Sequence, residues 1–210
     1  MFQADFYLIL KWWFLFFGIG LVFLPFTISL FKNFIDKGYI FSKVFATIII
    51  SYIVFILGIL HIALFSNPTI FSVIFISIVF NLFFFKKGFL LNLKQNWIIF
   101  LLEEVIFFIG ILFLSYVRSH APDIHGLEKF MDFGFVNSIL RADYFPPKDM
   151  WFTPFSINYY YFGHLMTAVL TKISMISSSI TYNLMLSSLF AFTFTCSFSI
   201  GANLIYFFLI

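Results

Sequence analysis

The chain has 210 residues, of which 62% are hydrophobic and 10% are charged, and its net charge at pH 7 is +3. A water-soluble domain of this size could not bury so much apolar surface, and the dispersed cations form no basic stripe for nucleic acid. The composition therefore predicts an all-α, polytopic transmembrane helix bundle in contact with the lipid bilayer. We expect a multi-pass protein of the cell membrane with no nucleic-acid partner.

Six apolar segments are long enough to cross the hydrocarbon core, which takes about 20 residues of helix. We expect three of them in an N-terminal membrane region, residues 1–96, and three in a second membrane domain, residues 97–210. The last segment exceeds one span and ends without a polar tail, so we expect the chain to be a fragment that is truncated at its C-terminus. The predicted spans cover about 6–31, 44–66, 69–85, 97–117, 157–176 and 182–210.

Lysines mark two of the connections between the predicted spans. Short cytoplasmic loops carry an excess of Lys and Arg, whereas the turn at Asn67 and Pro68 has no charge. We therefore place both lysine loops in the cytoplasm and the long loop 118–156 on the extracytoplasmic side. The lysines are Lys32, Lys37 and Lys43 in the first loop and Lys86, Lys87 and Lys94 in the second.

The long loop 118–156 contains five of the nine acidic residues of the chain. Between residues 127 and 140 charged residues alternate with large apolar ones, which predicts a helix lying in the membrane interface. Glu128 and Asp132 are four residues apart, so their carboxylates share one face of that helix. A solvated helix face and a pair of acid/base groups both explain this spacing.

Two stretches of the chain resemble a known signature. They read "GLEKFMDFGFVNSILRADYFPPKDMWF" at residues 126–152 and "INYYYFG" at residues 157–163. They closely resemble the YYY-domain membrane proteins, a family grouped with the GT-C superfamily of polytopic glycosyltransferases. The resemblance covers about residues 103–183. Met150 departs from it, because the family usually has proline between the Asp and the Trp.

The resemblance implies an enzyme that transfers a sugar from a lipid-phosphate donor, such as a polyprenyl phosphate, at the extracytoplasmic face. It leaves open whether a divalent metal, Mg or Mn, is needed. An acceptor hydroxyl needs a carboxylate to take its proton, and the departing phosphate needs cations. The implied roles are base or metal ligand for Glu128 and Asp132, phosphate binding for Lys129 and Arg141, and contacts to sugar or acceptor for Asp149 and Asn158.

The tyrosine triplet opens the predicted fifth span. On a helix Tyr159, Tyr160 and Tyr161 point in different directions, and one or two of them fit the aromatic belt at the membrane interface. Asn158 and Tyr161 share a face, which we expect to form the floor of a substrate site below the acidic loop.

Four ionisable residues fall inside the predicted spans: Glu103, Glu104, His164 and Lys172. A buried carboxylate needs a partner, and Glu104 and Lys172 lie at similar depths when counted at about 1.5 Å per residue. We therefore predict that Glu103 or Glu104 pairs with Lys172 or hydrogen-bonds His164, as a structural pair rather than a proton relay. A membrane transporter or lipid flippase would instead use these four residues as its pathway. A non-catalytic scaffold subunit would use none of the candidate residues.

Overall fold

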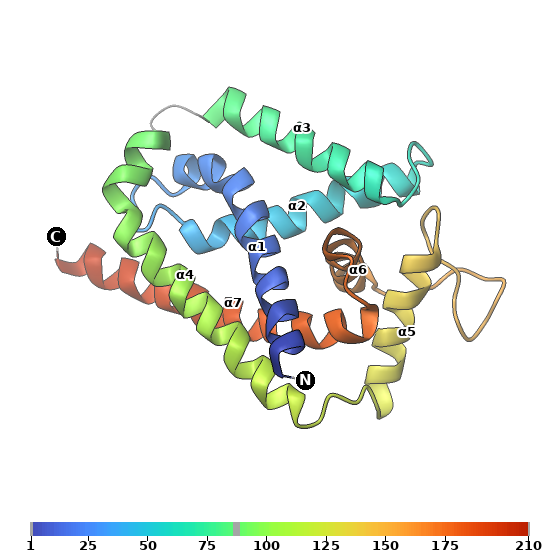
Figure 1. The fold of residues 1–210 in the computed structure, drawn as a ribbon. Coiled ribbons are helices and arrows are strands. Elements are labelled where there is room, and N and C mark those ends of the chain that lie inside the picture. Colours follow the sequence, from blue (N-terminus) through green and yellow to red (C-terminus); the bar gives the residue numbers. More distant parts are fainter. Residues whose placement is uncertain (1, 86–88, 210) are drawn as a thin grey trace.

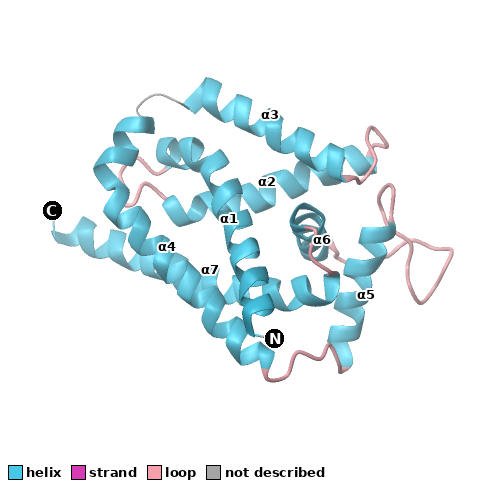
Figure 2. Ribbon diagram, in the orientation of Figure 1, coloured by secondary structure: helices cyan, strands magenta, loops and turns pink. Residues whose placement is uncertain are grey.

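The computed structural model describes residues 2–85 and 89–209 and, within them, contains seven helices and no strand (Figure 1, Figure 2). The predicted all-α, polytopic bundle is therefore confirmed. The helices are α1 (Phe2–Leu30), α2 (Tyr39–Ile59), α3 (Asn67–Phe85), α4 (Phe89–Ser119), α5 (Leu127–Arg141), α6 (Phe162–Ser174) and α7 (Ser178–Leu209).

Five of the described helices are long and apolar enough to cross a membrane: α1, α2, α3, α4 and α7. Their outer faces carry large exposed apolar side chains, such as Phe75 and Phe83 on α3 and Ile98 on α4. A soluble protein does not expose apolar surface on this scale, so these faces contact the lipid bilayer. The inner faces meet in one core, where α1 and α2 pack against α6 and α7.

The predicted fifth span is wrong. Residues 157–161 are not helical, and α6 has only 13 residues. At 1.5 Å per residue it is about 20 Å long, whereas the hydrocarbon core is about 30 Å thick. In Figure 1, α6 is seen nearly along its axis while α2 and α3 run across the view, so it lies crosswise among the spans. The bundle therefore has five candidate spans in the described residues rather than six.

α4 and α7 run antiparallel and touch along their length. At one end Arg118 of α4 hydrogen-bonds Asn183 of α7, and in the middle Gly110 faces Ala191. A Cβ at Gly110 would lie only 2.9 Å from the Cβ of Ala191, so glycine is what permits this approach. Because α6 does not cross, α7 starts at the end of the bundle where α4 finishes.

One end of the bundle, here called the lysine end, holds the α1–α2 connection, the end of α3 and the start of α4. Tyr39 and Phe100 stack there, and Phe26 meets Phe85. Lys32 is exposed in the α1–α2 connection, and Lys37 also lies there, partly buried. Lys86 and Lys87 lie outside the described residues. Lys43 was predicted in the first loop, but it lies within α2 and is only 1% exposed.

The opposite end, here called the loop end, carries α5 and residues 142–161 (Figure 1). α5 runs across this end, continuous through Gly134, and packs against α6 and α7. The segment after it folds back on the α2–α3 turn, where the N–H of Phe65 donates to the carbonyl of Asp143 at 2.7 Å. Phe145 is buried there against Gly58 and Phe65.

Candidate functional site

The cavities at the loop end lie around α5. Four cavities in the described residues each include side chains of this helix in their walls. Their volumes are about 740, 260, 480 and 580 Å³. Some of the candidate residues predicted from the sequence line these cavities: Asp132, Arg141, Asp149, Asn158 and His164.

Asp132 is held by a histidine from the next helix. His164, in the first turn of α6, places its Nε2 3.0 Å from Oδ1 of Asp132, and its ring packs edge-on against Phe135. The Asp132 side chain keeps 34% of its surface exposed. Both residues line the 260 Å³ cavity together with Tyr160 and Tyr182. The packing of α5 on α6 thus fixes one candidate carboxylate at the mouth of a cavity.

Glu128 and Lys129 lie one turn before Asp132 and are exposed. Within the described part of the chain neither side chain has a hydrogen bond or an ion pair. In the described residues neither Lys129 nor Arg141 pairs with Glu128 or Asp132, and the side chain that contacts Asp132 is His164. The described residues also contain no group of three or more His, Cys, Asp and Glu side chains that could hold a metal ion. Glu128 and Asp132 thus have no third side chain of these types beside them among the described residues to complete a metal centre.

The largest cavity has a mostly apolar surface, with apolar side chains from α1, α5 and α7, and polar side chains among them include the guanidinium of Arg118. Asn183 Oδ1 accepts hydrogen bonds from Nε and Nη2 of Arg118 at 3.0 and 2.6 Å, and its amide nitrogen donates to the carbonyl of Pro122 at 3.0 Å. Asp5, at the start of α1, and Asp123 also line this cavity. Arg118 has no ion-pair partner within residues 2–85 and 89–209. Arg118 is not among the site residues predicted from the sequence, although it is a cation in the last turn of an apolar span.

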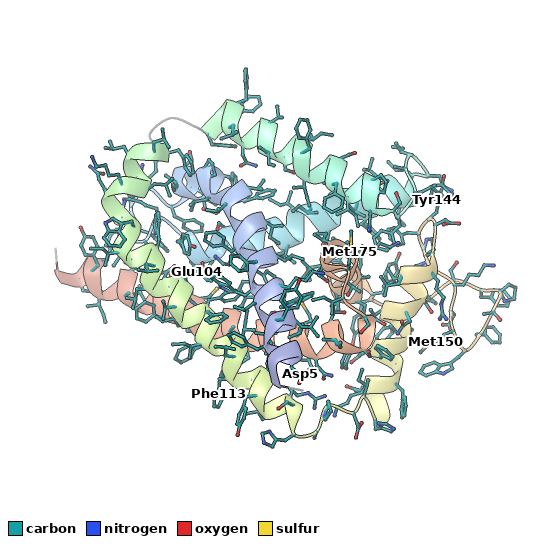
Figure 3. All side chains as sticks on the ribbon, viewed as in Figure 1. Asp5, Glu104, Phe113, Tyr144, Met150 and Met175 are labelled. Atoms are coloured by element: carbon teal, nitrogen blue, oxygen red, sulfur yellow. The ribbon has the colours of Figure 1, made fainter. Side chains whose placement is uncertain are left out.

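Asp149 and Asn158 come together at the wall of the 480 Å³ cavity. Oδ1 of Asp149 accepts hydrogen bonds from the backbone N–H groups of Trp151 and Phe152, so this carboxylate shapes the turn that follows it. Arg141 lies instead in the 580 Å³ cavity, which Asp149 also borders. Figure 3 places Met150 beside α5, where its side chain fills the space that Gly134 leaves.

The tyrosine triplet precedes α6 and is not helical, so the predicted shared helix face of Asn158 and Tyr161 is wrong. Tyr161 stands immediately before α6 and packs its ring against Phe55 of α2. Tyr159 donates a hydrogen bond of 2.6 Å to Tyr160. That hydrogen bond raises the pKa of Tyr159, and the nearby carboxylates of Glu128 and Asp132 add to the effect. The two tyrosines therefore stand beside the candidate carboxylates.

The predicted pairing of the intramembrane glutamates is wrong. Oε2 of Glu104 lies 2.6 Å from Nζ of Lys43, not near Lys172 or His164. Lys172 instead lies 4.6 Å from the centre of the Phe65 ring at the loop end. The predicted pairing assumed that Lys172 lies on a helix that crosses the membrane, so that its depth could be counted along the span. α6 does not cross, and the depth counted for Lys172 therefore does not apply.

Comparison with known proteins shows a family match. A model described as an uncharacterized membrane protein (DUF2298) matches residues 49–208. No curated protein and no solved structure matches the chain. The matched range includes the whole loop end and four of the five candidate spans in whole or in part. Because the match covers more than half of the chain, the protein belongs to the DUF2298 family of uncharacterized membrane proteins.

Proposed function

We propose that the protein is a membrane glycosyltransferase of the GT-C type, which transfers a sugar from a lipid-phosphate-linked donor at the extracytoplasmic face. One observation supports this most. α5 borders an apolar cavity with a guanidinium through Phe130 and Phe133, and it carries the His164-bound carboxylate of Asp132 into a second cavity. The cavity that contains the anion-binding Arg118 and the cavity that contains the proton acceptor Asp132 thus share α5 as a wall.

The large cavity suits the lipid part of such a donor. Its volume of about 740 Å³ lies in the range of small-molecule sites, and its wall is mostly apolar. Two of the N–H groups of Arg118 are used on Asn183, which leaves the others to bind phosphate oxygens. Lys129 and Arg141 remain proposed phosphate contacts for other parts of the donor.

Asp132 is the carboxylate best placed to act as the base. The acceptor hydroxyl oxygen forms the new bond to the anomeric carbon, and the bond from that carbon to the phosphate oxygen breaks. The hydroxyl proton passes to Asp132, and the leaving phosphate keeps the electron pair beside Arg118. His164 orients Asp132, so it is a positioning residue. Glu128 is the second candidate on the same helix, and Asp149, Asn158 and Tyr161 are the proposed contacts to sugar or acceptor.

The test uses the full chain in lipid vesicles with a panel of lipid-linked sugar donors and mass detection of the product. We expect Asp132→Asn to lower kcat about 100-fold or more. We expect Arg118→Ala to raise KM for the donor as well. Lys94→Ala removes an exposed cation on α4 at the lysine end and should leave both constants unchanged. Full turnover by Asp132→Asn would refute the assignment of the base.

The same cavity supports one alternative, a lipid flippase, because an apolar space with a guanidinium also fits a lipid headgroup in transit. A flippase moves the lipid without changing its covalent structure. Movement of a labelled lipid phosphate across the vesicle membrane, with no sugar transferred from any donor, would favour it. That movement should then depend on Arg118 and not on Asp132.

A further inference from the structure

A second cluster of charged groups lies deep in the bundle, toward the lysine end and away from the candidate site. Figure 3 labels Glu104, one of its two members on α4, within the bundle. Asp36, Lys43, Glu103 and Glu104 all have exposed fractions of 6% or less. Charged groups taken out of water need partners, because the cost of leaving a charge uncompensated in a low-dielectric interior is several kcal/mol or more.

Glu104 is fully compensated. Nζ of Lys43 lies 2.6 Å from its Oε2, the hydroxyl of Tyr39 donates to the same oxygen, and Nε1 of Trp13 donates to Oε1 at 2.6 Å. One cation and two neutral donors therefore satisfy one carboxylate. Lys43 is the only buried cation among the described residues, and its charge is used here.

Asp36 accepts hydrogen bonds but meets no cation. Its Oδ1 accepts from the N–H of Gly38 at 2.9 Å, and its Oδ2 accepts from the hydroxyl of Ser199 and from Nδ2 of Asn203 at 2.9 Å. The amide orientation of Asn203 is fixed, because its Oδ1 accepts from the N–H of Ile35 at 2.8 Å. Three donors on one carboxylate are the environment of the ionised form.

Glu103 has the opposite environment. It is 0% exposed, its Oε2 accepts one hydrogen bond from the N–H of Ile40 at 3.1 Å, and its Oε1 receives no hydrogen bond from any described residue. Its carboxyl group lies beside that of Asp36, because the two accept hydrogen bonds from backbone N–H groups only two residues apart at the start of α2, those of Ile40 and Gly38. An ionised carboxylate in this position would lack both a donor for one oxygen and a cation for its charge. A protonated carboxyl group instead has an O–H to donate, and Asp36 is the acceptor beside it.

We infer that Glu103 and Asp36 form a buried proton-binding site, in which Glu103 carries the proton at neutral pH and donates it to the Asp36 carboxylate. The groups that face this pair are Tyr39 and Lys43 from α2, Glu104 from α4, Trp13 from α1 through Glu104, and Cys196, Ser199 and Asn203 from α7. Lys43, their one cation, is paired with Glu104. The shared proton thus joins the α1–α2 connection to α4 and α7.

The consequence is a bond between helices that depends on one proton. Removal of the proton leaves two adjacent carboxylates with no cation paired to either among the described residues, and their repulsion opposes the contact of the α1–α2 connection with α4. The site lies apart from α5 and its cavities, so it can be tested without reference to sugar transfer.

The experiment is infrared spectroscopy of the full chain in lipid nanodiscs, in which protonated carboxyl groups show a C=O stretching band distinct from that of carboxylates. We expect the wild-type protein to show this band at pH 7 and to keep it as the pH is raised past the range in which exposed Asp and Glu side chains ionise. Glu103→Gln should remove the band, and Asp143→Asn, a control that removes an exposed carboxyl group at the loop end, should keep it. A wild-type spectrum without the band at neutral pH, or a band that persists in Glu103→Gln, would overturn the inference.

Thermal unfolding of the same samples gives a second readout. Glu103→Gln keeps an N–H donor toward Asp36, so its midpoint should stay within a few degrees of wild type. Glu104→Gln leaves Lys43 uncompensated and should lower the midpoint by about 10 °C. If a monovalent cation held the pair instead, the wild-type midpoint would rise with Na⁺ or K⁺ concentration and Glu103→Gln would abolish that rise, a result that contradicts the shared proton.

Discussion

Gly58→Ala tests how the loop end is fastened to the spans, because the sign of its effect depends on one contact. Gly58 lies in the last turn of α2, and a Cβ there would overlap the ring of Phe145. That ring is 2% exposed and held between Phe55 and Phe65, so it has no free direction in which to move.

Two opposing terms set the magnitude. In a helix interior, replacing glycine by alanine stabilises by about 1 kcal/mol when nothing obstructs the methyl group. Overpacking of a closed site costs about 1–3 kcal/mol. The overlap at Phe145 is with a confined ring rather than a flexible chain end, so the second term should exceed the first. We expect a net destabilisation of about 1 kcal/mol.

The assay is denaturant or thermal unfolding in detergent micelles, with Gly18→Ala as the matched control. Gly18 lies in α1, another span, and an added Cβ there would meet no atom within 4 Å. It should therefore stabilise the protein while Gly58→Ala destabilises it. In a Phe145→Ala background the penalty of Gly58→Ala should disappear, as expected for residues in direct contact. Equal stabilisation by both alanine variants would refute the packing of Phe145 on α2.

Three further predictions concern charges and close contacts. Lys43→Met should destabilise the protein by about 3–5 kcal/mol, because it leaves Glu104 buried and uncompensated. Lys172→Met removes a cation–π contact and no ion pair, so it should cost about 1 kcal/mol or less. Unfolding measurements on both variants distinguish this arrangement from a Glu104–Lys172 pair. Tyr160→Phe removes the hydrogen-bond acceptor of Tyr159, so the pKa of Tyr159 should fall toward its ordinary value. Tyrosinate absorbance should then appear at lower pH than in the wild-type protein. An unchanged titration would show that the hydrogen bond is absent in solution. Gly110→Leu should force α4 and α7 apart and lower the unfolding midpoint. Gly201→Leu is the control, because an added Cβ at Gly201 meets no atom within 4 Å, and it should leave the midpoint nearly unchanged. Equal midpoints for the two variants would contradict the close α4–α7 contact.

The spans could be predicted from the sequence because apolar length is a direct requirement of the bilayer. The same measure failed at residues 157–176. Apolarity does not distinguish a helix that crosses the membrane from an extended segment followed by a short helix packed among other spans. Tyr161 and Met175, which bound α6, carry no strong breaker signal such as Pro. The crosswise position of α6 follows from packing against several helices, which a linear sequence does not display.

The sequence could predict which residues belong to the candidate site but not which side chains contact each other there. The acidic helix α5 and the position of Glu128 and Asp132 on it follow from helical spacing. The contact of Asp132 with His164 depends on how α5 packs on α6, 32 residues further along the chain. Lys43 was assigned to a loop because lysine is usually exposed, and only the fold shows the buried carboxylate that retains it.

α7 has no Asp, Glu, Lys or Arg anywhere along its length, so the helix itself carries no charge that could orient it in the membrane. Its direction follows instead from α4, against which it packs antiparallel, with Asn183 at Arg118 and Asn203 at the α1–α2 connection. We therefore expect packing against the spans made before it to orient α7 during biosynthesis. A change of the charges in the two predicted lysine loops would then also change the orientation of α7, although α7 contains no lysine.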